Sequence, residues 1–320
     1  MKIIQNTTKK IRVEIEKISN RPFYYMNYSG NYCYDEYLLK GTCNLEEFCT
    51  FINENLIFNS EKKISKENFG CGAFVAQNTD GDIIFARNMD CEYAIPMMIR
   101  LSEDNDYKSL ALASMADLDW DENTYETLET DAKLTLAAPY SPYDGINEHG
   151  LAVAFMTDAS AIYPNRSNKV TLFDFTLLRL LLNKAKSVDE AIKYMKNYNL
   201  FYDVAPLHYM VADATGDAAV IEFVDGKMVT IRKNNNYQVV TNFTLYNNPT
   251  HNGFGKDRYE NIESELEKRQ GIITDKDALE LLKKNVIPGD EQWSAVYNLT
   301  KRRVMVTFSR EYNLVYCYEL

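Results

Sequence analysis

The chain has 320 residues, of which 46% are hydrophobic and 25% are charged, so its composition is that of an ordinary globular protein. A net charge of −11 and a sequence pI of about 4.9 argue against nucleic acid or an anionic membrane as a partner. No run of about 18 apolar residues occurs. Charged side chains also interrupt the first 20 residues, so the sequence predicts neither a membrane span nor a signal peptide.

Cysteine and histidine usage excludes two further classes of protein. Six cysteines in a chain of 320 residues are too sparse for a disulfide scaffold. The sequence has no Cys-x-x-Cys pair and its three histidines lie far apart, so we predict no metal site and no cofactor. The predicted location is the reducing cytoplasm.

Residues 1–70 differ from the rest and are predicted to form a helical N-terminal leader. They carry a cluster of tyrosines, and Asn44-Leu45-Glu46-Glu47 resembles a capping box that opens a helix through about Phe58. Residues 59–68 are polar and lysine-rich, as in an exposed linker. Two interpretations stay open, namely a propeptide that is cleaved and retained, and an extension that is never cut.

The stretch from Gly70 to Asp90 is predicted to form a β-hairpin. Asp80-Gly81 lies between two apolar runs, a strong hairpin signal because both central residues of a type I′ turn need positive φ. A two-residue loop would place Cys71 opposite Asp90, with Cβ atoms about 5 Å apart, and Arg87 on the other face. A bulge, a longer turn or an earlier strand end would bring Arg87 round to Cys71.

Cys71, Arg87 and Asp90 suit the chemistry of a thiol nucleophile. A thiol with a pKa of about 8.5 is mostly protonated at neutral pH, and a cation such as Arg87 lowers that pKa. Cleavage between Gly70 and Cys71 would give Cys71 a free α-amino group with a pKa of about 7.7–8.0, which suits a proton shuttle. Nucleophile and base would then be one residue, as in N-terminal threonine enzymes. Asp90 would supply a carboxylate acceptor.

Strands and helices alternate in blocks after the hairpin. The apolar run from Cys91 to Leu101, with Met97 and Met98, is predicted to pack in the core or to line an acyl pocket. Period-two and helical patterns then predict the remaining elements. They are strands at 110–115, 134–138 and 151–156 around a turn at 143–150, helices at 171–184 and 187–198, strands at 208–212, 218–224, 228–232 and 238–241, helices at 257–270 and 274–285, and strands at 293–298, 304–309 and 314–318.

Hairpins dominate this pattern, which indicates antiparallel sheets and an α+β fold. Two such sheets packed face to face, with a helix pair on each outer face, would use every apolar face. The pattern permits this arrangement without selecting it over other α+β layouts.

Several motifs together resemble the choloylglycine hydrolase family, which includes bile salt hydrolases and penicillin V acylases. They are the run from Cys71 to Asp90, the segments 144–151 and 207–213, and Val240-Thr241-Asn242, and the resemblance covers roughly residues 71–320. The family consists of N-terminal nucleophile (Ntn) amide hydrolases. The resemblance therefore implies a catalytic domain at 71–320 with a four-layer αββα sandwich of two antiparallel sheets, matured by cleavage after Gly70.

The same resemblance implies the roles of further residues. Asn242 matches the asparagine whose amide donates to the oxyanion, and Arg258 matches an arginine near the thiol. Thr157 stands where bile salt hydrolases have asparagine and penicillin V acylases have tyrosine, so it is an oxyanion candidate of shorter reach. The long leader and the short interval from Asn242 to Arg258 instead resemble the acid ceramidase branch.

Three other interpretations remain beside hydrolysis by an N-terminal cysteine. A papain-like Cys–His pair would need His149, His208 or His251 near Cys71. Acyl transfer to an amine would resemble the penicillin acyltransferases, and a non-enzymatic binding protein would keep only the fold. The predicted partner is a small apolar N-acyl amide, and nothing in the sequence opposes a homo-oligomer.

Overall fold

The computed structural model describes residues 1–6, 10–57, 69–102, 106–121, 123–127, 134–289 and 291–320. The linker predicted at 59–68 lies outside these ranges. Within the described residues, no helix combines the length and hydropathy needed to cross a bilayer.

Ten strands form the larger sheet, and their spatial order is β1-β2-β3-β6-β7-β8-β9-β12-β13-β14. Their bounds are β1 Lys2–Asn6, β2 Ile11–Lys17, β3 Tyr24–Ser29, β6 Pro96–Ser102, β7 Ser109–Ser114, β8 Pro142–Asn147, β9 Ala152–Thr157, β12 Leu207–Ala212, β13 Ala218–Val224 and β14 Lys227–Arg232. Every neighbouring pair is antiparallel except β3 and β6, which run parallel.

Six strands form the smaller sheet, in the order β15-β4-β5-β16-β17-β18, and all of its pairs are antiparallel. Their bounds are β4 Phe69–Gln77, β5 Ile83–Cys91, β15 Gln238–Val240, β16 Glu291–Asn298, β17 Arg303–Phe308 and β18 Tyr316–Glu319. A separate parallel pair joins β10 Thr171–Phe173 to β11 Asn199–Phe201.

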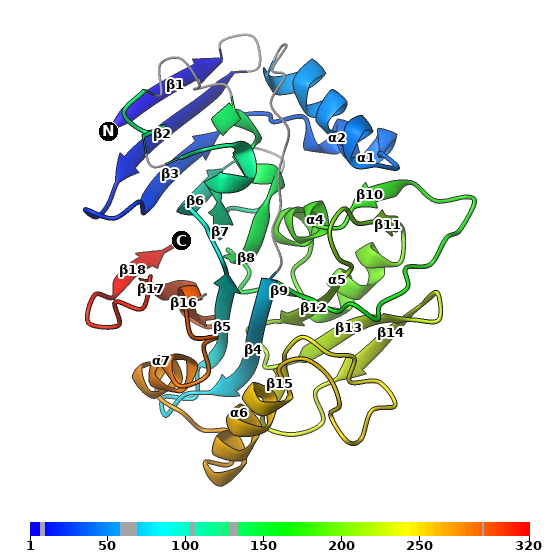
Figure 1. Ribbon diagram of the computed structural model, residues 1–320, viewed down its shortest axis with the longest axis vertical. Coiled ribbons are helices and arrows are strands. Elements are labelled where there is room, and N and C mark those ends of the chain that lie inside the picture. The colour runs from blue at the N-terminus through cyan, green and yellow to red at the C-terminus, as the bar shows by residue number, and fades with distance from the viewer. Residues whose placement is uncertain (7–9, 58–68, 103–105, 122, 128–133, 290) are drawn as a thin grey trace.

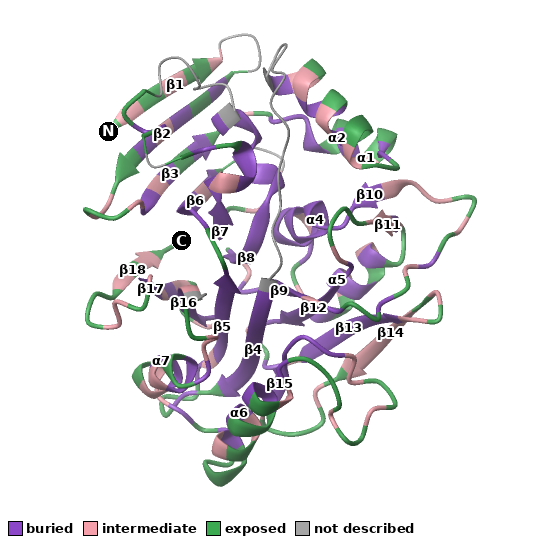
Figure 2. Cartoon of the chain, viewed as in Figure 1, coloured by how far each residue is buried: buried purple, intermediate pink, exposed green. Residues whose placement is uncertain are grey.

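Helices cover the outer face of each sheet (Figure 1). Helices α4 Thr176–Lys184 and α5 Val188–Met195 pack on the larger sheet, and α6 Lys256–Lys268 and α7 Asp275–Lys283 pack on the smaller one. Figure 2 shows the strands between these layers as buried. The predicted α+β fold of four αββα layers is therefore confirmed, with the parallel β3–β6 pair as the one departure from purely antiparallel sheets.

The loop between β4 and β5 decides which side chains face each other, and of the alternatives that the sequence left open it is the longer turn. Asn78 N–H donates to Asp82 O at 2.8 Å, and three residues, 79–81, form the loop, with Gly81 at φ +88°. This longer turn pairs Cys71 with Met89 and Gly70 with Asp90. Cys71 and Arg87 consequently share one face of the sheet.

Residues 1–57 are only partly helical. Helices α1 Tyr34–Lys40 and α2 Leu45–Ile52 form as the capping pattern predicts, with Asn44 Oδ1 accepting from Glu47 N–H at 2.9 Å. Residues before them form β1–β3, because their apolar side chains alternate with exposed ones along each strand and join the edge of the larger sheet. The prediction of a helical leader is thus wrong for this part.

Two other predicted elements are wrong for a local reason, and one predicted helix begins later than expected. The segment Leu134–Tyr140 is a 3₁₀ helix rather than a strand, and it ends beside Pro139. The segment Pro142–Asn147 is strand β8 rather than a turn, because Gly145 packs so closely on β7 that a Cβ there would lie 2.7 Å from Leu110 O and 3.0 Å from Ala111 Cα. The helix predicted from Thr171 begins at Thr176, after strand β10.

Candidate active site

Cys71 lies on β4 of the smaller sheet, on the face that packs against the larger sheet. Its side chain is fully buried, and Arg87 Nη2 lies 3.4 Å from its Sγ. Met89, its partner in register, places its sulfur 3.7 Å from the same Sγ. Gly70, which precedes Cys71, is buried as well. The structure thus brings the predicted nucleophile and the first predicted arginine together.

Arg87 is held by a buried carboxylate that we did not predict from the sequence. Asp144 Oδ2 lies 3.1 Å from Arg87 Nη1, and both side chains are inaccessible to solvent. Asp144 also accepts hydrogen bonds from Trp293 Nε1, at 3.0 Å, and from the Tyr297 hydroxyl. Arg87 Nη2 donates to Phe155 O at 3.0 Å. Asp144 lies in the segment 144–151 that carried the family resemblance, which was the signal available for it.

Opposing effects act on the ionisation of the thiol and of the arginine. Burial raises the pKa of the Cys71 thiol, Arg87 and Arg258 oppose this rise, and the Asp90 charge adds to it, so the pKa is raised overall. Burial lowers the pKa of Arg87, but the charges of Cys71 and Asp144 outweigh it, and that pKa is raised. The uncut site therefore holds a neutral thiol beside a cation that stays charged.

Asn242 connects the Cys71 backbone to the larger sheet. Its Oδ1 accepts from Cys71 N–H at 2.7 Å and from Arg258 Nη2 at 3.0 Å. Two donors on one side fix the orientation of the amide, so Nδ2 points the other way. It donates to Thr157 O at 3.1 Å and to Thr157 Oγ1 at 3.0 Å. The two predicted oxyanion residues are therefore adjacent, and in the uncut chain Asn242 directs its donors to Thr157.

Arg258 and Asp90 flank the backbone of Cys71. Arg258 stands in the first turn of α6 and donates from Nη1 to Cys71 O at 2.7 Å. Asp90 Oδ2 lies 3.7 Å from the same Nη1, and Asp90 Oδ1 accepts from Ile287 N–H at 3.1 Å. Gly255, with φ +84°, lets the guanidinium come close, because a Cβ there would stand 2.6 Å from Arg258 Nη2. Asp90 thus reaches Cys71 through Arg258.

The three histidines have other surroundings. The ring of His149 packs against Tyr107, with centroids 4.3 Å apart. The ring of His251 packs against Tyr259 at 4.4 Å. His208 Nε2 lies 2.7 Å from Thr241 O. Each ring therefore has a neighbour that explains its place without a Cys–His pair.

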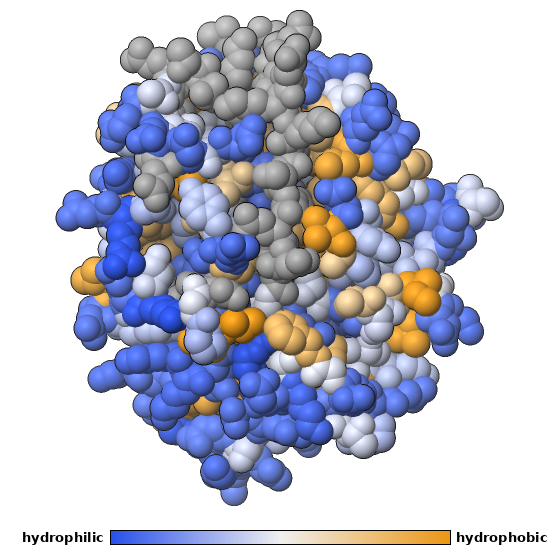
Figure 3. Space-filling view, viewed as in Figure 1, coloured by the Kyte–Doolittle hydropathy of each residue, from blue (hydrophilic) through white to orange (hydrophobic). Residues whose placement is uncertain are grey.

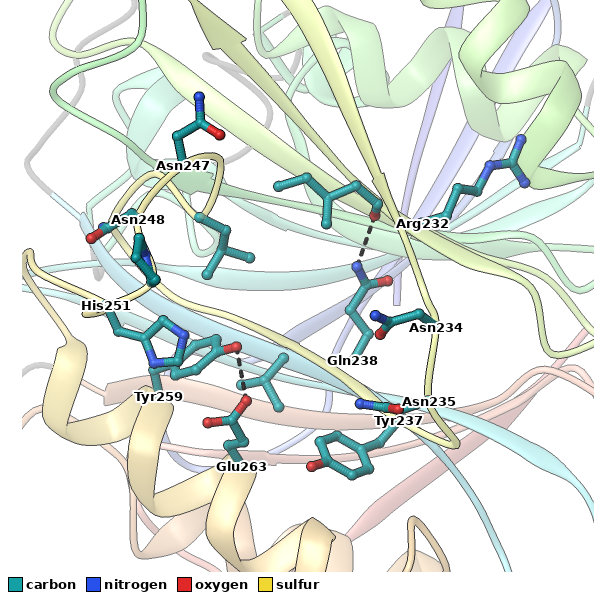
Figure 4. A pocket seen from close by; sticks show the side chains of 14 residues that line it. Arg232, Asn234, Asn235, Tyr237, Gln238, Asn247, Asn248, His251, Tyr259 and Glu263 are labelled. Atoms are coloured by element: carbon teal, nitrogen blue, oxygen red, sulfur yellow. Dashed lines mark hydrogen bonds between the residues drawn. The ribbon is translucent and has the colours of Figure 1, made fainter.

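A cavity of about 530 Å³ lies near the site but is lined by different residues. Figure 4 shows Gln238, Tyr237, Tyr259 and Glu263 around it, with the Tyr259 hydroxyl bonded to Glu263. Tyr259 follows Arg258 in α6, so consecutive residues of this turn contribute to the cavity and to the thiol site. Among the described lining residues, none is a predicted catalytic residue. Met97 and Met98, which we considered for an acyl pocket, are fully buried core residues of β6.

Exposed apolar side chains occur close to the catalytic segments. Figure 3 shows hydrophobic side chains gathered near the middle of a largely hydrophilic face. Phe254 is 62% exposed, and its ring centroid lies 5.4 Å from the guanidinium carbon of Arg258. Tyr246, four residues after Asn242, is also exposed. Exposed apolar side chains of this kind can contact an apolar molecule, and the fold itself does not bury them.

Comparisons with known proteins find a family model and two curated relatives. The family model for linear amide C–N hydrolases of the choloylglycine hydrolase family matches residues 71–289. A penicillin V acylase of Pectobacterium atrosepticum is 34% identical over 114 residues, which are 32% of this chain and 30% of that protein. A bile salt hydrolase/transferase of Clostridium perfringens is 28% identical over 187 residues, which are 54% of this chain and 53% of that protein.

A solved structure supports the fold. A variant of the conjugated bile acid hydrolase from Clostridium perfringens superposes with a TM-score of 0.55 at 16% identity, over 78% of this chain and 92% of that chain. The chain spans about a third and about half of the length of the two curated relatives that it matches. The family model, in contrast, covers more than half of the chain. The chain therefore belongs to the choloylglycine hydrolase family of linear amide C–N hydrolases.

Proposed function

We propose that this protein hydrolyses linear amide C–N bonds with Cys71 as an N-terminal nucleophile, which it exposes by cutting itself after Gly70. Membership of the family supports the reaction type. The observation that carries the residue assignment is the convergence on Cys71 of Arg87 at its sulfur, Arg258 at its carbonyl and Asn242 at its N–H.

Maturation follows from the position of the buried thiol next to its own peptide bond. Cys71 Sγ attacks the carbonyl carbon of Gly70, the Cys71 nitrogen leaves with a proton, and a thioester links Gly70 to Sγ. Water hydrolyses this thioester and releases a Gly70 carboxylate, a thiol and the α-amine of Cys71. The absence of a side chain on Gly70 favours this attack, and Ile287 packs where a Cβ would stand.

Catalysis uses the groups that maturation frees. The α-amine of Cys71 takes the thiol proton as Sγ attacks the substrate carbonyl, and it then gives that proton to the leaving amine. Arg87 stabilises the thiolate, Arg258 and Asp90 hold the Cys71 backbone, and Asn242 with Thr157 donates to the oxyanion. A single oxyanion donor typically contributes about 2.7–4 kcal/mol to lowering the barrier. Water hydrolyses the acyl-enzyme and restores the thiol.

The proposed substrate is an amide with an apolar acyl group. The exposed ring of Phe254 beside Arg258 and the exposed Tyr246 support it, because both would contact an acyl chain that enters from this face. Transfer of the acyl group to an amine is the second candidate, since the name of the Clostridium perfringens relative includes transferase activity. The proposed location is the cytoplasm, on the strength of the sparse cysteines.

The decisive test of maturation is intact mass together with N-terminal sequencing of the purified protein. We expect fragments of 70 and 250 residues, the second beginning at Cys71, and an uncut, inactive chain for Cys71→Ala. A full-length wild-type chain that still hydrolyses amides would remove the α-amine from the mechanism. No cleavage and no reaction of Cys71 with an amide-mimicking electrophile would point to a binding protein instead.

The substrate test is a hydrolysis screen over conjugated bile salts, penicillin V and fatty N-acyl amides. We expect turnover of at least one apolar acyl amide by wild type and none by Cys71→Ala. Added acceptor amines distinguish the two candidate reactions, since new amide products would favour acyl transfer and unchanged release of free acid would favour hydrolysis.

A further inference from the structure

Three ionisable side chains that the proposed mechanism does not use form one buried cluster between the sheets. His208 on β12 and Glu222 on β13 are fully buried, and Asp158, just after β9, is 2% exposed. His208 Nδ1 lies 3.6 Å from Glu222 Oε1 and 3.9 Å from Asp158 Oδ2. His208 Nε2 lies 2.7 Å from Thr241 O, and a carbonyl only accepts, so Nε2 carries a hydrogen in this geometry.

The two carboxylates of this cluster hold the chain that follows β15. Glu222 accepts from the backbone N–H groups of Leu245, at 2.7 Å, and Tyr246, at 2.9 Å. Asp158 Oδ2 accepts from the Thr244 hydroxyl at 2.6 Å. Together with the His208–Thr241 hydrogen bond, these contacts hold residues 241–246 at both ends. This segment follows β15 of the smaller sheet, whereas His208 and Glu222 lie on strands of the larger one (Figure 1).

Asn242 lies within residues 241–246, and Thr157 lies next to the cluster. Asn242 Oδ1 meets Cys71 N–H, and Asn242 Nδ2 meets Thr157, which directly precedes Asp158. The cluster therefore sets the spacing between the two oxyanion candidates and the nucleophile. Spacing of this kind controls rate steeply, because a misplacement of about 1 Å can cost about 100-fold.

The charges in the cluster depend on each other. Two buried carboxylates side by side repel unless a cation lies between them. Burial lowers the pKa of His208, but its interactions with Glu222 and Asp158 outweigh burial and raise that pKa above its usual value. The groups that face the ring are Glu222 from β13, Asp158 from the end of β9 and the Thr241 carbonyl from the opposite sheet.

We propose that His208, clamped between Glu222 and Asp158, is a positioning residue that fixes Asn242 against Cys71. The inference rests on the proposed function, since it names what holds the oxyanion side of that site. Because the folded-state pKa of His208 is raised, the cluster holds residues 241–246 fully at low pH. Its hold weakens as the pH rises through the pKa of His208. Activity should therefore show an alkaline limb that belongs to His208 and depends on its two carboxylate neighbours.

The test compares His208→Gln and Asp158→Asn with wild type. His208→Gln keeps a donor for Thr241 O but carries no charge, and we expect kcat to fall about 10- to 100-fold, with KM within about twofold. Asp158→Asn removes one carboxylate and should move the alkaline limb of kcat down by about one pH unit. The matched control is Asp225→Asn, an exposed carboxylate in the turn after β13, which should leave both readouts unchanged.

Hydrogen exchange of residues 245 and 246 in the Cys71→Ala background gives a readout independent of hydrolysis. We expect faster exchange of these two amides in both cluster variants and wild-type exchange in Asp225→Asn. If residues 245 and 246 exchange at the wild-type rate in the cluster variants, and the alkaline limb of kcat does not move in Asp158→Asn, the inference is overturned. If wild type hydrolyses no amide, the proposed function fails, and exchange alone then decides whether the cluster holds the segment.

Discussion

The ion pair of Arg87 and Asp144 is the most consequential pair of residues around the thiol. Two charges are removed from water there, and their mutual attraction, the donors Trp293 and Tyr297 and the acceptor Phe155 O compensate. A lysine would lose the planar fork that meets Asp144, Phe155 O and Cys71 Sγ at once. We therefore regard Asp144 as the residue that keeps Arg87 aimed at the sulfur.

Replacing Arg87 should shift the pH dependence of self-cleavage. The thiolate attacks, and Arg87 opposes the rise that burial causes in the Cys71 pKa, so Arg87→Met should raise that pKa by about one unit or more. The cleavage rate of freshly translated chain, followed on denaturing gels from pH 6 to 10, should then rise only at higher pH than in wild type. Arg12→Met, which removes an exposed arginine paired with Glu14, is the control. An unmoved profile in Arg87→Met would contradict the role of Arg87.

The sequence predicted the residue types of this site better than their geometry. Cys71, Arg87, Asn242, Arg258 and Thr157 do converge, because the family motifs carry them. Local patterning could not choose between a two-residue and a three-residue loop, and that choice alone decides whether Arg87 faces Cys71. Asp144 is paired across 57 residues, and no local periodicity reports such a contact.

At the scale of elements, the start of α6 is what brings Arg258 to the Cys71 backbone. Gly255 precedes the helix with φ +84°, a conformation that costs an L-residue about 1–2 kcal/mol. A Cβ there would also press on Arg258 Nη2 at 2.6 Å and on Thr241 at 3.1 Å. The glycine is therefore required both by backbone conformation and by the close approach of the guanidinium.

Gly255→Ala should impair the enzyme more than it destabilises the fold. The backbone strain predicts a loss of about 1–2 kcal/mol in unfolding free energy, while displacement of Arg258 should reduce kcat about tenfold or more. Gly226→Ala is a matched control, because Gly226 has φ +70° with no atom within 4 Å of an added Cβ. Denaturant unfolding and amide turnover of both variants separate the two effects. Equal losses of activity in both would refute a specific role for Gly255.

Elements with a local chemical signal were predicted well. Two helices begin at Ser187 and Thr274, as predicted. The Ser187 side chain accepts from the backbone N–H of Glu190, and the Thr274 side chain accepts from that of Asp277. The turn at Asp225-Gly226 has both residues at positive φ, as its sequence demands. Strand β8 was missed because its Asp-Gly step reads as a turn locally, whereas burial of Asp144 and packing of Gly145 against β7 override that signal.

At the scale of the whole molecule, the described part of residues 1–57 adds three strands to the larger sheet and packs against the smaller one. Strand β3 pairs in parallel with β6 of the catalytic part. The Tyr34 hydroxyl donates to Thr176 O at 2.5 Å, and Tyr140 donates to Tyr32 O at 2.8 Å. The Phe23 ring stacks on Phe308 of β17, with centroids 3.6 Å apart. A leader with this many buried contacts is part of the core rather than a removable cover.

After cleavage we therefore expect the 70- and 250-residue fragments to stay together. They should co-elute on size exclusion in native buffer and separate in denaturant, because the cut removes one peptide bond and none of the buried contacts. Tyr34→Ala should weaken this association, since truncating a fully buried aromatic ring typically costs about 3–5 kcal/mol. Leu39→Ala, which truncates an 81% exposed side chain of α1, should elute like wild type. Free 250-residue fragment from wild type in native buffer would show that the leader is dispensable after cleavage, in conflict with its place in the larger sheet.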